Sequence, residues 1–412
     1  MDLSPSLMNQ ERARQLMRRK GLDAIIAASA VNVTYASGFH SPSPHVFSDM
    51  QVFALVPQDT EASSLVIPRD ELTYVGVSPA SVEDIRVYGE TTLQWSDEAT
   101  YDAIETRVRQ LMTTRSRHTD PVEALVSAID DRGLLRARMG LDGRGIQPAH
   151  LAHLRRLLPE AELVDASELW RSIRAVKTPP ELERLRRASQ INEEALAASI
   201  GISRVGVTQA DLYDAYQARV IERGGFLHYW GGGVGSQSAL FGPPIPNHRG
   251  QSGDVIRIDG AMTYQFYWAD TGRTVVLGEV TERQKTYYAA LHEGLYAGLA
   301  LVCPGAHPSQ IFDAIVETVQ RAGIAHYFRF HCGHGLGLEF YEIPSIRPAT
   351  NGAEEILLEE GMVLNVEVPY YELGFGGMQI EDTLLVTAGG YEFITERSRE
   401  LIVSGQTSHK RK

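Results

Sequence analysis

Acidic side chains lie inside strongly apolar segments in the C-terminal half of the chain. Asp259 ends the run VIRID, Glu367 ends MVLNVE, and Glu381 lies within QIEDTLLV. A carboxylate buried in a sheet without a partner costs several kcal/mol or more. A fold that buries these three residues must therefore supply positive charge, and divalent metal ions would do so.

Two further residues extend this set. Asp270 follows Asp259 by eleven residues, within ADTGRT, and His334 lies in CGHGLGL. We expect a hairpin to return Asp270 beside Asp259, and the glycines around His334 permit close approach of backbone to a ligand. Asp382 points to the opposite face of its strand from Glu381 and is not counted as a ligand. Four carboxylates and one imidazole have the composition of a two-metal hydrolase site.

The length, charge and cysteine spacing of the whole chain limit the class of protein to which it can belong. Its 412 residues suffice for two hydrophobic cores. The formal charge is -13 and the basic residues are scattered, so we expect no nucleic-acid partner. The sequence lacks a run of about 18 apolar residues, so we expect no membrane partner and a cytoplasmic location. Cys303 and Cys332 lack a CxxC spacing and are expected to be reduced thiols.

The pattern of apolar and polar residues along the sequence changes near residue 172. Residues 1–172 alternate short apolar runs with helical patterns, which predicts an α/β domain with a mostly buried sheet. A helix is predicted to start at Thr178-Pro-Pro-Glu181. Residues 173–403 combine helices with long β-rich segments, which predicts α+β with an antiparallel sheet. The segment 404–412 is a polar tail, and the glycine-rich segment 230–236 lacks phosphate-loop spacing and is predicted to be a mobile loop.

Five phrases carry a family resemblance. In chain order they are IDG (258–260), ADTGRT (269–274), GHGLGL (333–338), NVEVP (365–369) and IEDT (380–383). They resemble the motifs of the pita-bread metallopeptidases, the family of methionine aminopeptidase, Xaa-Pro aminopeptidase, prolidase and creatinase. NVTYASGF (32–39) is similar to a phrase of the creatinase-type N-terminal domain. The resemblance implies a creatinase-like α/β domain over 1–172 and a pita-bread α+β catalytic domain over 173–403.

The resemblance also implies roles for the five residues. Asp259 would chelate one metal ion, His334 and Glu367 would bind the other, and Asp270 and Glu381 would bridge the two. Manganese is the expected metal, and Co(II), Zn(II) and Fe(II) also suit an oxygen-rich site with one imidazole. A hydroxide bridging the metals would attack an amide carbonyl. Glu367 would carry the proton to the departing amine.

The chain departs from this family pattern at three positions. Relatives that cleave Xaa-Pro bonds have a substrate-contacting histidine seven positions after the metal-binding one, where this chain has Tyr341. A second family histidine falls on Gly242, and an arginine two residues before the last ligand is replaced by Gln379. We expect the Tyr341 hydroxyl to replace one donor to the developing oxyanion.

Other residues are candidates to replace the missing histidines or to line the substrate pocket. His331 is a catalytic candidate, and His248 and His228 are further candidates to replace the missing histidines. We expect Trp230, Phe241, Gly242, His248, Tyr341 and Gln379 to contact substrate.

Three functions are open at this point. The first is a dinuclear-metal hydrolase of Xaa-Pro peptidase type that cleaves an amide C–N bond in a short peptide. The second keeps the metals but acts on a small non-peptide metabolite, by amide hydrolysis or lyase chemistry, as the lost histidines suggest. The third is a non-enzymatic binding or scaffold protein, which the five retained ligands disfavour. By family analogy we expect a homodimer.

Overall fold

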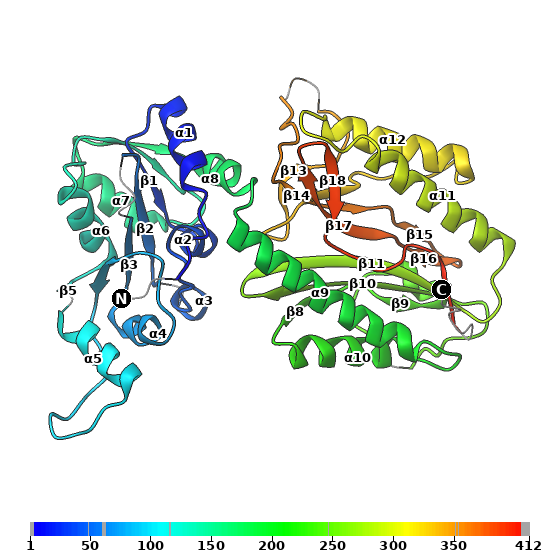
Figure 1. Ribbon diagram of the computed structural model, residues 1–412, viewed down its shortest axis with the longest axis horizontal. Helices are drawn as coiled ribbons and strands as arrows, with labels where there is room; N and C mark the ends of the chain where they lie inside the picture. Colours follow the sequence, from blue (N-terminus) through cyan, green and yellow to red (C-terminus); the bar gives the residue numbers. More distant parts are fainter. Residues whose placement is uncertain are drawn as a thin grey trace. The chain divides into compact units, whose positions relative to one another are not determined.

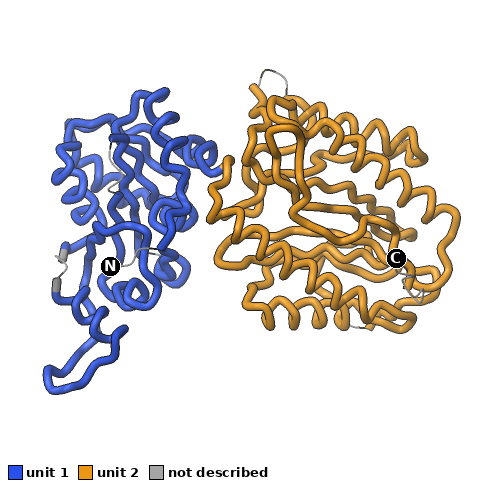
Figure 2. Tube along the Cα trace, viewed as in Figure 1, with its two compact units in different colours: residues 1–174 blue, residues 175–412 orange. Residues whose placement is uncertain are grey.

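The chain forms two compact units, residues 1–174 and 175–412 (Figure 2). The structure is a computed structural model, and it describes residues 4–404 apart from 48, 60–62, 115–116, 246, 351 and 353. The predicted polar tail lies outside the described residues from 405 onward, while Ser404 belongs to the last strand. Both cysteines are free thiols.

The first unit is built on a mixed seven-stranded sheet. Its strand order is β5-β4-β3-β2-β1-β6-β7. Strand β2 is antiparallel to β1 and to β3, and all other neighbours are parallel. The strands are β1 (Ala24–Ala27), β2 (Phe53–Pro57), β3 (Ser64–Pro68), β4 (Asp84–Tyr88), β5 (Arg117–His118), β6 (Arg138–Leu141) and β7 (Glu162–Asp165). Every residue of β1, β2 and β3 is buried, as expected for a sheet covered by helices on both faces.

The helices of the first unit complete the α/β domain. They are α1 (Gln10–Lys20), α2 (Ala30–Ser37), α3 (Ser43–Val46), α4 (Leu72–Val77), α5 (Ala103–Thr114), α6 (Pro121–Asp130), α7 (Pro148–Leu157) and α8 (Ser167–Arg174), with a 3₁₀ turn η1 (Arg69–Glu71). Helix α6 packs on β2, β3 and β4, and its apolar face joins the core of the sheet. The α/β prediction is confirmed, although β3 was not predicted as a strand.

The second unit is built on a ten-stranded sheet. The strand order is β13-β12-β14-β17-β11-β10-β8, with β18 on β17, β19 on β11 and β9 on β10. All pairs are antiparallel except β11 with β19. The strands are β8 (Phe226–Trp230), β9 (Gly233–Val234), β10 (Val255–Tyr264), β11 (Tyr267–Leu277), β12 (Gly333–Gly335), β13 (Glu342–Ser345), β14 (Val363–Glu367), β17 (Glu381–Thr387), β18 (Gly390–Phe393) and β19 (Ile402–Ser404), and β15 (Tyr370–Glu372) pairs separately with β16 (Gly376–Met378).

Four long helices pack against this sheet. They are α9 (Pro179–Ile202), α10 (Gln209–Glu222), α11 (Glu282–Leu299) and α12 (Pro308–Ala322), with a 3₁₀ turn η2 (Gly235–Ala239). Helix α9 begins as predicted, with a capping box between Thr178 and Glu181. It packs on β10 and β11, while α11 packs on α12 (Figure 1). The antiparallel α+β prediction is confirmed. None of the helices in the described part of the chain is long and apolar enough to span a membrane.

One sequence expectation for this unit was wrong. The glycine-rich segment 230–236 is not a free loop, because Gly233 and Val234 form β9, are buried, and pair with β10. A side chain at Gly233 would overlap the backbone of Ser238 in the turn η2. The glycine is therefore required for close packing beside the first predicted metal-ligand strand.

Candidate metal centre

The register of four strands places the acidic residues in one row. Glu367 of β14 lies opposite Glu381 of β17, Glu381 lies opposite Gly272 of β11, and Gly272 lies opposite Asp259 of β10. Residues opposite each other in a sheet project from the same face. Asp270 lies two residues before Gly272 and projects from that face as well. Ligand atoms of Asp259, Asp270 and Glu381 lie within 4.8 Å of one another.

These residues line an open cavity of about 430 Å³. All five predicted ligands reach its wall, including His334 from β12. The remaining wall is largely aromatic, with one cationic side chain and one amide. These other lining residues are Tyr229, Phe241, Arg329, Phe330, His331, Phe340, Tyr341, Tyr371 and Gln379.

Amide side chains hold two of the carboxylates. Asn365 Nδ2 donates to Asp270 Oδ2 at 3.0 Å and to Glu381 Oε1 at 2.6 Å. Gln379 Nε2 donates to Glu381 Oε2 at 2.7 Å. Asp270 Oδ1 is buried without a hydrogen-bond partner among the described residues. A buried oxygen of this kind needs a ligand outside the polypeptide.

Burial and mutual repulsion strongly disfavour ionisation of this cluster. Burial, together with the neighbouring carboxylates, raises the pKa values of Asp270 and Glu381 well above their usual range. Burial also raises the pKa of Asp259 to about 6, although Arg257 beside it acts in the opposite direction. Cations bound in the cavity would stabilise the ionised form of these carboxylates.

The imidazole of His334 is neutral and turned toward the carboxylates. Burial lowers the pKa of His334 to about 4. Nδ1 lies 2.9 Å from the carbonyl oxygen of Gly335, which assigns the proton to Nδ1. The unprotonated Nε2 then lies 3.8 Å from Asp270 Oδ2. Two acceptors facing each other in a buried site fit a shared metal ion, so the residues present fit the divalent ions that the sequence implies.

Glu367 differs from the other three carboxylates. Its Oε1 lies 2.9 Å from His331 Nδ1, and its Oε2 lies 3.5 Å from Arg329 Nη2. Burial alone would raise the pKa of Glu367, but His331 and Arg329 overcome that effect and hold it below its usual value. Glu367 is therefore ionised under conditions in which Asp270 and Glu381 hold protons.

The predicted substrate-contacting residues fall into two groups. Tyr341, Phe241 and Gln379 line the cavity. The Tyr341 ring lies 4.1 Å from that of His334, centroid to centroid, and 51% of the residue is exposed. Gly242 is exposed, directly after Phe241, and is not part of the wall formed by the described residues.

Three candidates lie elsewhere. Trp230 is only 7% exposed and packs against Tyr213 and Tyr216 in the core between α10 and the sheet, outside the cavity lining. His228 contacts Thr263 at 3.0 Å and its ring lies 4.3 Å from that of Trp268 in a tilted arrangement, outside the cavity lining. His248 is half-buried and also lies outside that lining.

Sequence reasoning missed several residues of the site. Asn365 and Arg257 each lie two positions before a predicted ligand, so the two-residue period of a strand could have placed them beside Glu367 and Asp259. Tyr371 lies in β15, and Arg329 lies in the irregular segment between α12 and β12. No local pattern in the sequence directs Arg329 toward the cavity.

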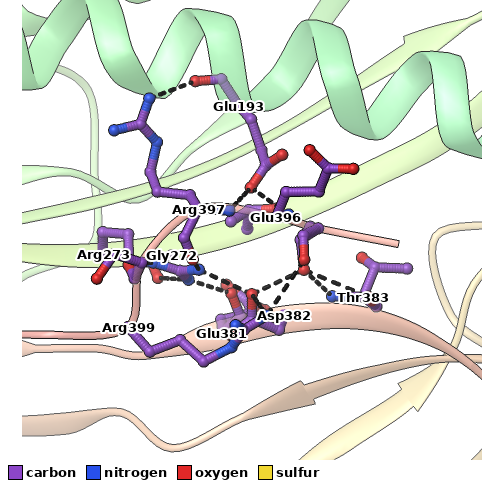
Figure 3. Close-up of polar contacts among 12 residues, drawn as sticks. Glu193, Gly272, Arg273, Glu381, Asp382, Thr383, Glu396, Arg397 and Arg399 are labelled. Carbon is purple, nitrogen blue, oxygen red and sulfur yellow. Dashed lines mark hydrogen bonds and ion pairs between the residues drawn. The ribbon is translucent and has the colours of Figure 1, made fainter. Parts of the chain in front are cut away.

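Asp382 has a separate, structural environment. It is fully buried and bound by Arg273 Nη2 at 2.7 Å, Arg399 Nε at 2.8 Å and Thr395 Oγ1 at 2.7 Å. Arg273 Nη1 also donates to the Glu381 carbonyl oxygen at 2.6 Å. Figure 3 shows these contacts converging on the strand that carries Glu381 and Asp382. These contacts join β17 to β11 and to the segment after β18. They thereby hold the backbone of Glu381 in place beside β11.

Comparison with known proteins identifies the family. Residues 183–388, half of the chain, match the model of metallopeptidase family M24, and residues 10–176 match the creatinase/prolidase N-terminal domain. The chain is 28% identical over 290 residues to a Xaa-Pro dipeptidase of Lactobacillus delbrueckii subsp. lactis, covering 69% of this chain and 77% of that protein. It is 26% identical over 345 residues to a Xaa-Pro dipeptidase of Pyrococcus horikoshii, covering 82% of this chain and 93% of that protein.

A solved structure shares the fold. The prolidase from Pyrococcus horikoshii OT3 superposes with a TM-score of 0.71 at 21% identity, covering 95% of this chain and 99% of that one. The two family models divide the chain near the boundary between the two compact units. The chain therefore belongs to metallopeptidase family M24, carries a creatinase/prolidase N-terminal domain, and is a metal-dependent hydrolase.

Proposed function

We propose that this enzyme hydrolyses the amide bond before proline in dipeptides or short peptides, using two divalent metal ions. The observation that carries the proposal is the row of Glu367, Glu381 and Asp259 across four strands, with Asp270 and the neutral His334 facing it in one cavity. Relatives named Xaa-Pro dipeptidases support the choice of substrate.

Five residues would hold the metal ions: Asp259, Asp270, His334, Glu367 and Glu381. When bound, the ions supply Lewis-acid polarisation of a carbonyl group and a water molecule of lowered pKa. Asn365 orients two of the ligands through its amide, and such supporting hydrogen bonds commonly decide metal affinity.

Glu367 provides the proton path, and His331 supports it. Glu367 is ionised, so one of its oxygens can take the proton that the attacking water loses. His331 Nδ1 lies 2.9 Å from Oε1 and holds Glu367 charged and in place by donating to it, so Glu367 itself would pass that proton to the departing amine. Arg329 at 3.5 Å from Oε2 keeps Glu367 charged between turnovers.

Tyr341 and the aromatic wall would orient the substrate. Burial and the nearby carboxylates raise the pKa of Tyr341, so its hydroxyl keeps its proton and can donate to a developing oxyanion. Phe241, Phe340 and Tyr371 offer apolar surface that suits a proline ring. A cavity of about 430 Å³ is within the range of small-molecule sites and suits a short peptide better than a folded protein.

The test is a substrate panel with the metal-loaded protein. Xaa-Pro dipeptides, longer peptides with N-terminal Xaa-Pro, and matched Xaa-Ala dipeptides are compared in Mn(II), with Asp270→Asn as the inactive control. Turnover restricted to the proline series and absent from the control supports the proposal. A metal-loaded enzyme that cleaves no member of the proline series would contradict it.

A second candidate follows from the altered cavity. Gly242 and Tyr341 stand where Xaa-Pro-cleaving relatives have histidines, so the same metals would act on a small non-peptide amide or a lyase substrate. Turnover of such compounds by a protein that does not cleave Xaa-Pro peptides would favour this candidate.

Three further expectations stay predictions: manganese as the metal, a homodimer, and a cytoplasmic location. Metal analysis, light scattering and cell fractionation test them in turn.

A further inference from the structure

We infer that Arg257 is the positioning residue for two of the proposed metal ligands, Asp259 and Glu381, and that an arginine at the position of Gln379 would take over this role from the segment just before β17. The inference rests on the proposed metal site. It concerns how this chain aims Asp259 and Glu381, whatever substrate the site takes.

Arg257 is fully buried and all its nitrogens are engaged. Nη1 donates to Asp259 Oδ2 at 2.9 Å and contacts Gln379 Oε1 at 3.3 Å. Nε donates to the Ser238 carbonyl oxygen at 2.8 Å, and Nη2 donates to the Leu240 carbonyl oxygen at 3.1 Å. The fork geometry of a guanidinium is needed for this set, and an ammonium group cannot reproduce it.

Gln379 carries the effect of Arg257 to the second ligand. Its Oε1 accepts from Arg257, and its Nε2 donates to Glu381 Oε2 at 2.7 Å. Because the amide oxygen faces the guanidinium, the amide nitrogen is directed at the carboxylate. One cation thus fixes Asp259 directly and Glu381 through an uncharged amide.

The sheet leaves room for this link. Gly272 lies between Asp259 and Glu381 in the row, and a side chain there would approach the Gln379 side chain to 2.7 Å. Thr274 pins the Gln379 backbone, because its hydroxyl accepts from Gln379 N at 2.7 Å and donates to Gln379 O at 3.0 Å. The Gln379 side chain therefore crosses β11 over a glycine to reach β10.

Aromatic rings fix the plane of the guanidinium. Its carbon lies 5.0 Å from the Phe241 ring centroid and 4.9 Å from that of Tyr371. Both rings also line the cavity. Arg257 itself is fully buried and is not among the described residues that line the cavity, so it acts through the ligands it contacts and is a positioning residue.

The experiment measures Mn(II) binding to the full chain by calorimetry. Supporting contacts to metal ligands typically contribute about 10- to 100-fold in affinity. Arg257→Met keeps the volume between the two rings but removes every donor, so Kd is expected to rise by about 10-fold or more. The double variant Arg257→Met/Gln379→Arg supplies a guanidinium from residue 379, just before β17, in place of the one lost from β10. Its Kd is expected to return most of the way to that of wild type. Arg86→Met, which removes a partly buried cation from Asp84 and Asp131 in the first unit, is the control and should leave Kd unchanged.

Each outcome decides the inference. Unchanged Kd in Arg257→Met would overturn it, and a double variant no better than Arg257→Met would overturn the exchange between the two positions. If Arg257→Met does not fold, Arg257→Lys replaces it, because an ammonium group keeps the charge but cannot reproduce these contacts, so Kd must rise there as well. A wild-type chain that binds no metal would overturn the proposed function as well. Wild-type binding with equal binding by the variants would overturn this inference alone.

Discussion

His331 Nδ1 lies 2.9 Å from Glu367 Oε1 across the wall of the metal-binding cavity. This contact offsets the burial of Glu367 and holds its pKa below the usual value, while Asp270 and Glu381 in the same row have raised pKa values. Of the four carboxylates Glu367 is the one whose pKa is lowered, and it is the one proposed to move protons.

Replacing His331 with alanine is expected to lower kcat by about 10²-fold, within the usual range for general acid–base groups. The pKa of Glu367 rises when the imidazole is removed, so the acid limb of the pH–rate profile moves to higher pH. Steady-state rates across pH measure both effects. His228→Ala, at an exposed histidine outside the cavity lining, is the control and should match wild type. An unshifted acid limb in His331→Ala would assign His331 to packing.

Tyr341→Phe is expected to lower kcat by about 10² to 10³, the usual loss for one oxyanion donor. The ring stays in place over His334, so KM should change little. Tyr341→His, which restores the residue of Xaa-Pro-cleaving relatives, is expected to retain or raise the rate on proline dipeptides. Equal rates for Tyr341→Phe and wild type would show that the hydroxyl takes no part in the reaction.

The metal-free protein is expected to lose stability as pH rises. The folded state holds protons on Asp270 and Glu381 that the unfolded chain releases near pH 4, so the folded state binds more protons and its stability falls above that pH. For Asp259, with a pKa raised to about 6, the loss falls between about pH 4 and pH 6. Glu367 and His334, with their lowered pKa values, act in the opposite direction, two groups of the cluster against three.

Thermal unfolding of chelator-treated protein across this pH range measures the effect. Added Mn(II) should remove the decline, because bound cations stabilise the ionised carboxylates. Metal-free protein that becomes more stable between about pH 5 and pH 7 would show that the cluster does not carry the raised pKa values.

Asp382→Ala is expected to destabilise the protein by about 3–5 kcal/mol, the usual cost of leaving buried charge unpaired. Arg273 is fully buried and would lose its carboxylate partner, as would Arg399. Denaturant unfolding measures the loss. A matched variant, Asp131→Ala, removes an exposed partner of Arg86 and should change stability by less than about 1 kcal/mol. Equal effects of the two variants would contradict the structural role of Asp382.

The five ligand candidates were accessible from the sequence because each lies in a short motif on or beside an apolar strand. Asp259 and Asp270 were placed side by side by a predicted hairpin, and the structure has that hairpin in β10 and β11. The row from Glu367 to Asp259 was not predictable, because it depends on the register of four strands that meet over long sequence separations. The buried position of Trp230 was not predictable, because an aromatic residue beside glycines fits a core as well as a pocket. Arg329 reaches the cavity from an irregular segment that has no periodicity to interpret.

The most direct test of the central claim is metal stoichiometry of wild type and Asp270→Asn, by elemental mass spectrometry after Mn(II) reconstitution and removal of free metal. Asp270 has one buried oxygen with no hydrogen-bond partner among the described residues and lies beside three other ligand side chains. The account predicts about two equivalents of Mn(II) per wild-type chain and clearly less in the variant, with both proteins folded. Less than about 0.2 equivalents in wild type, or equal content in the two proteins, would contradict a dinuclear site built on these residues.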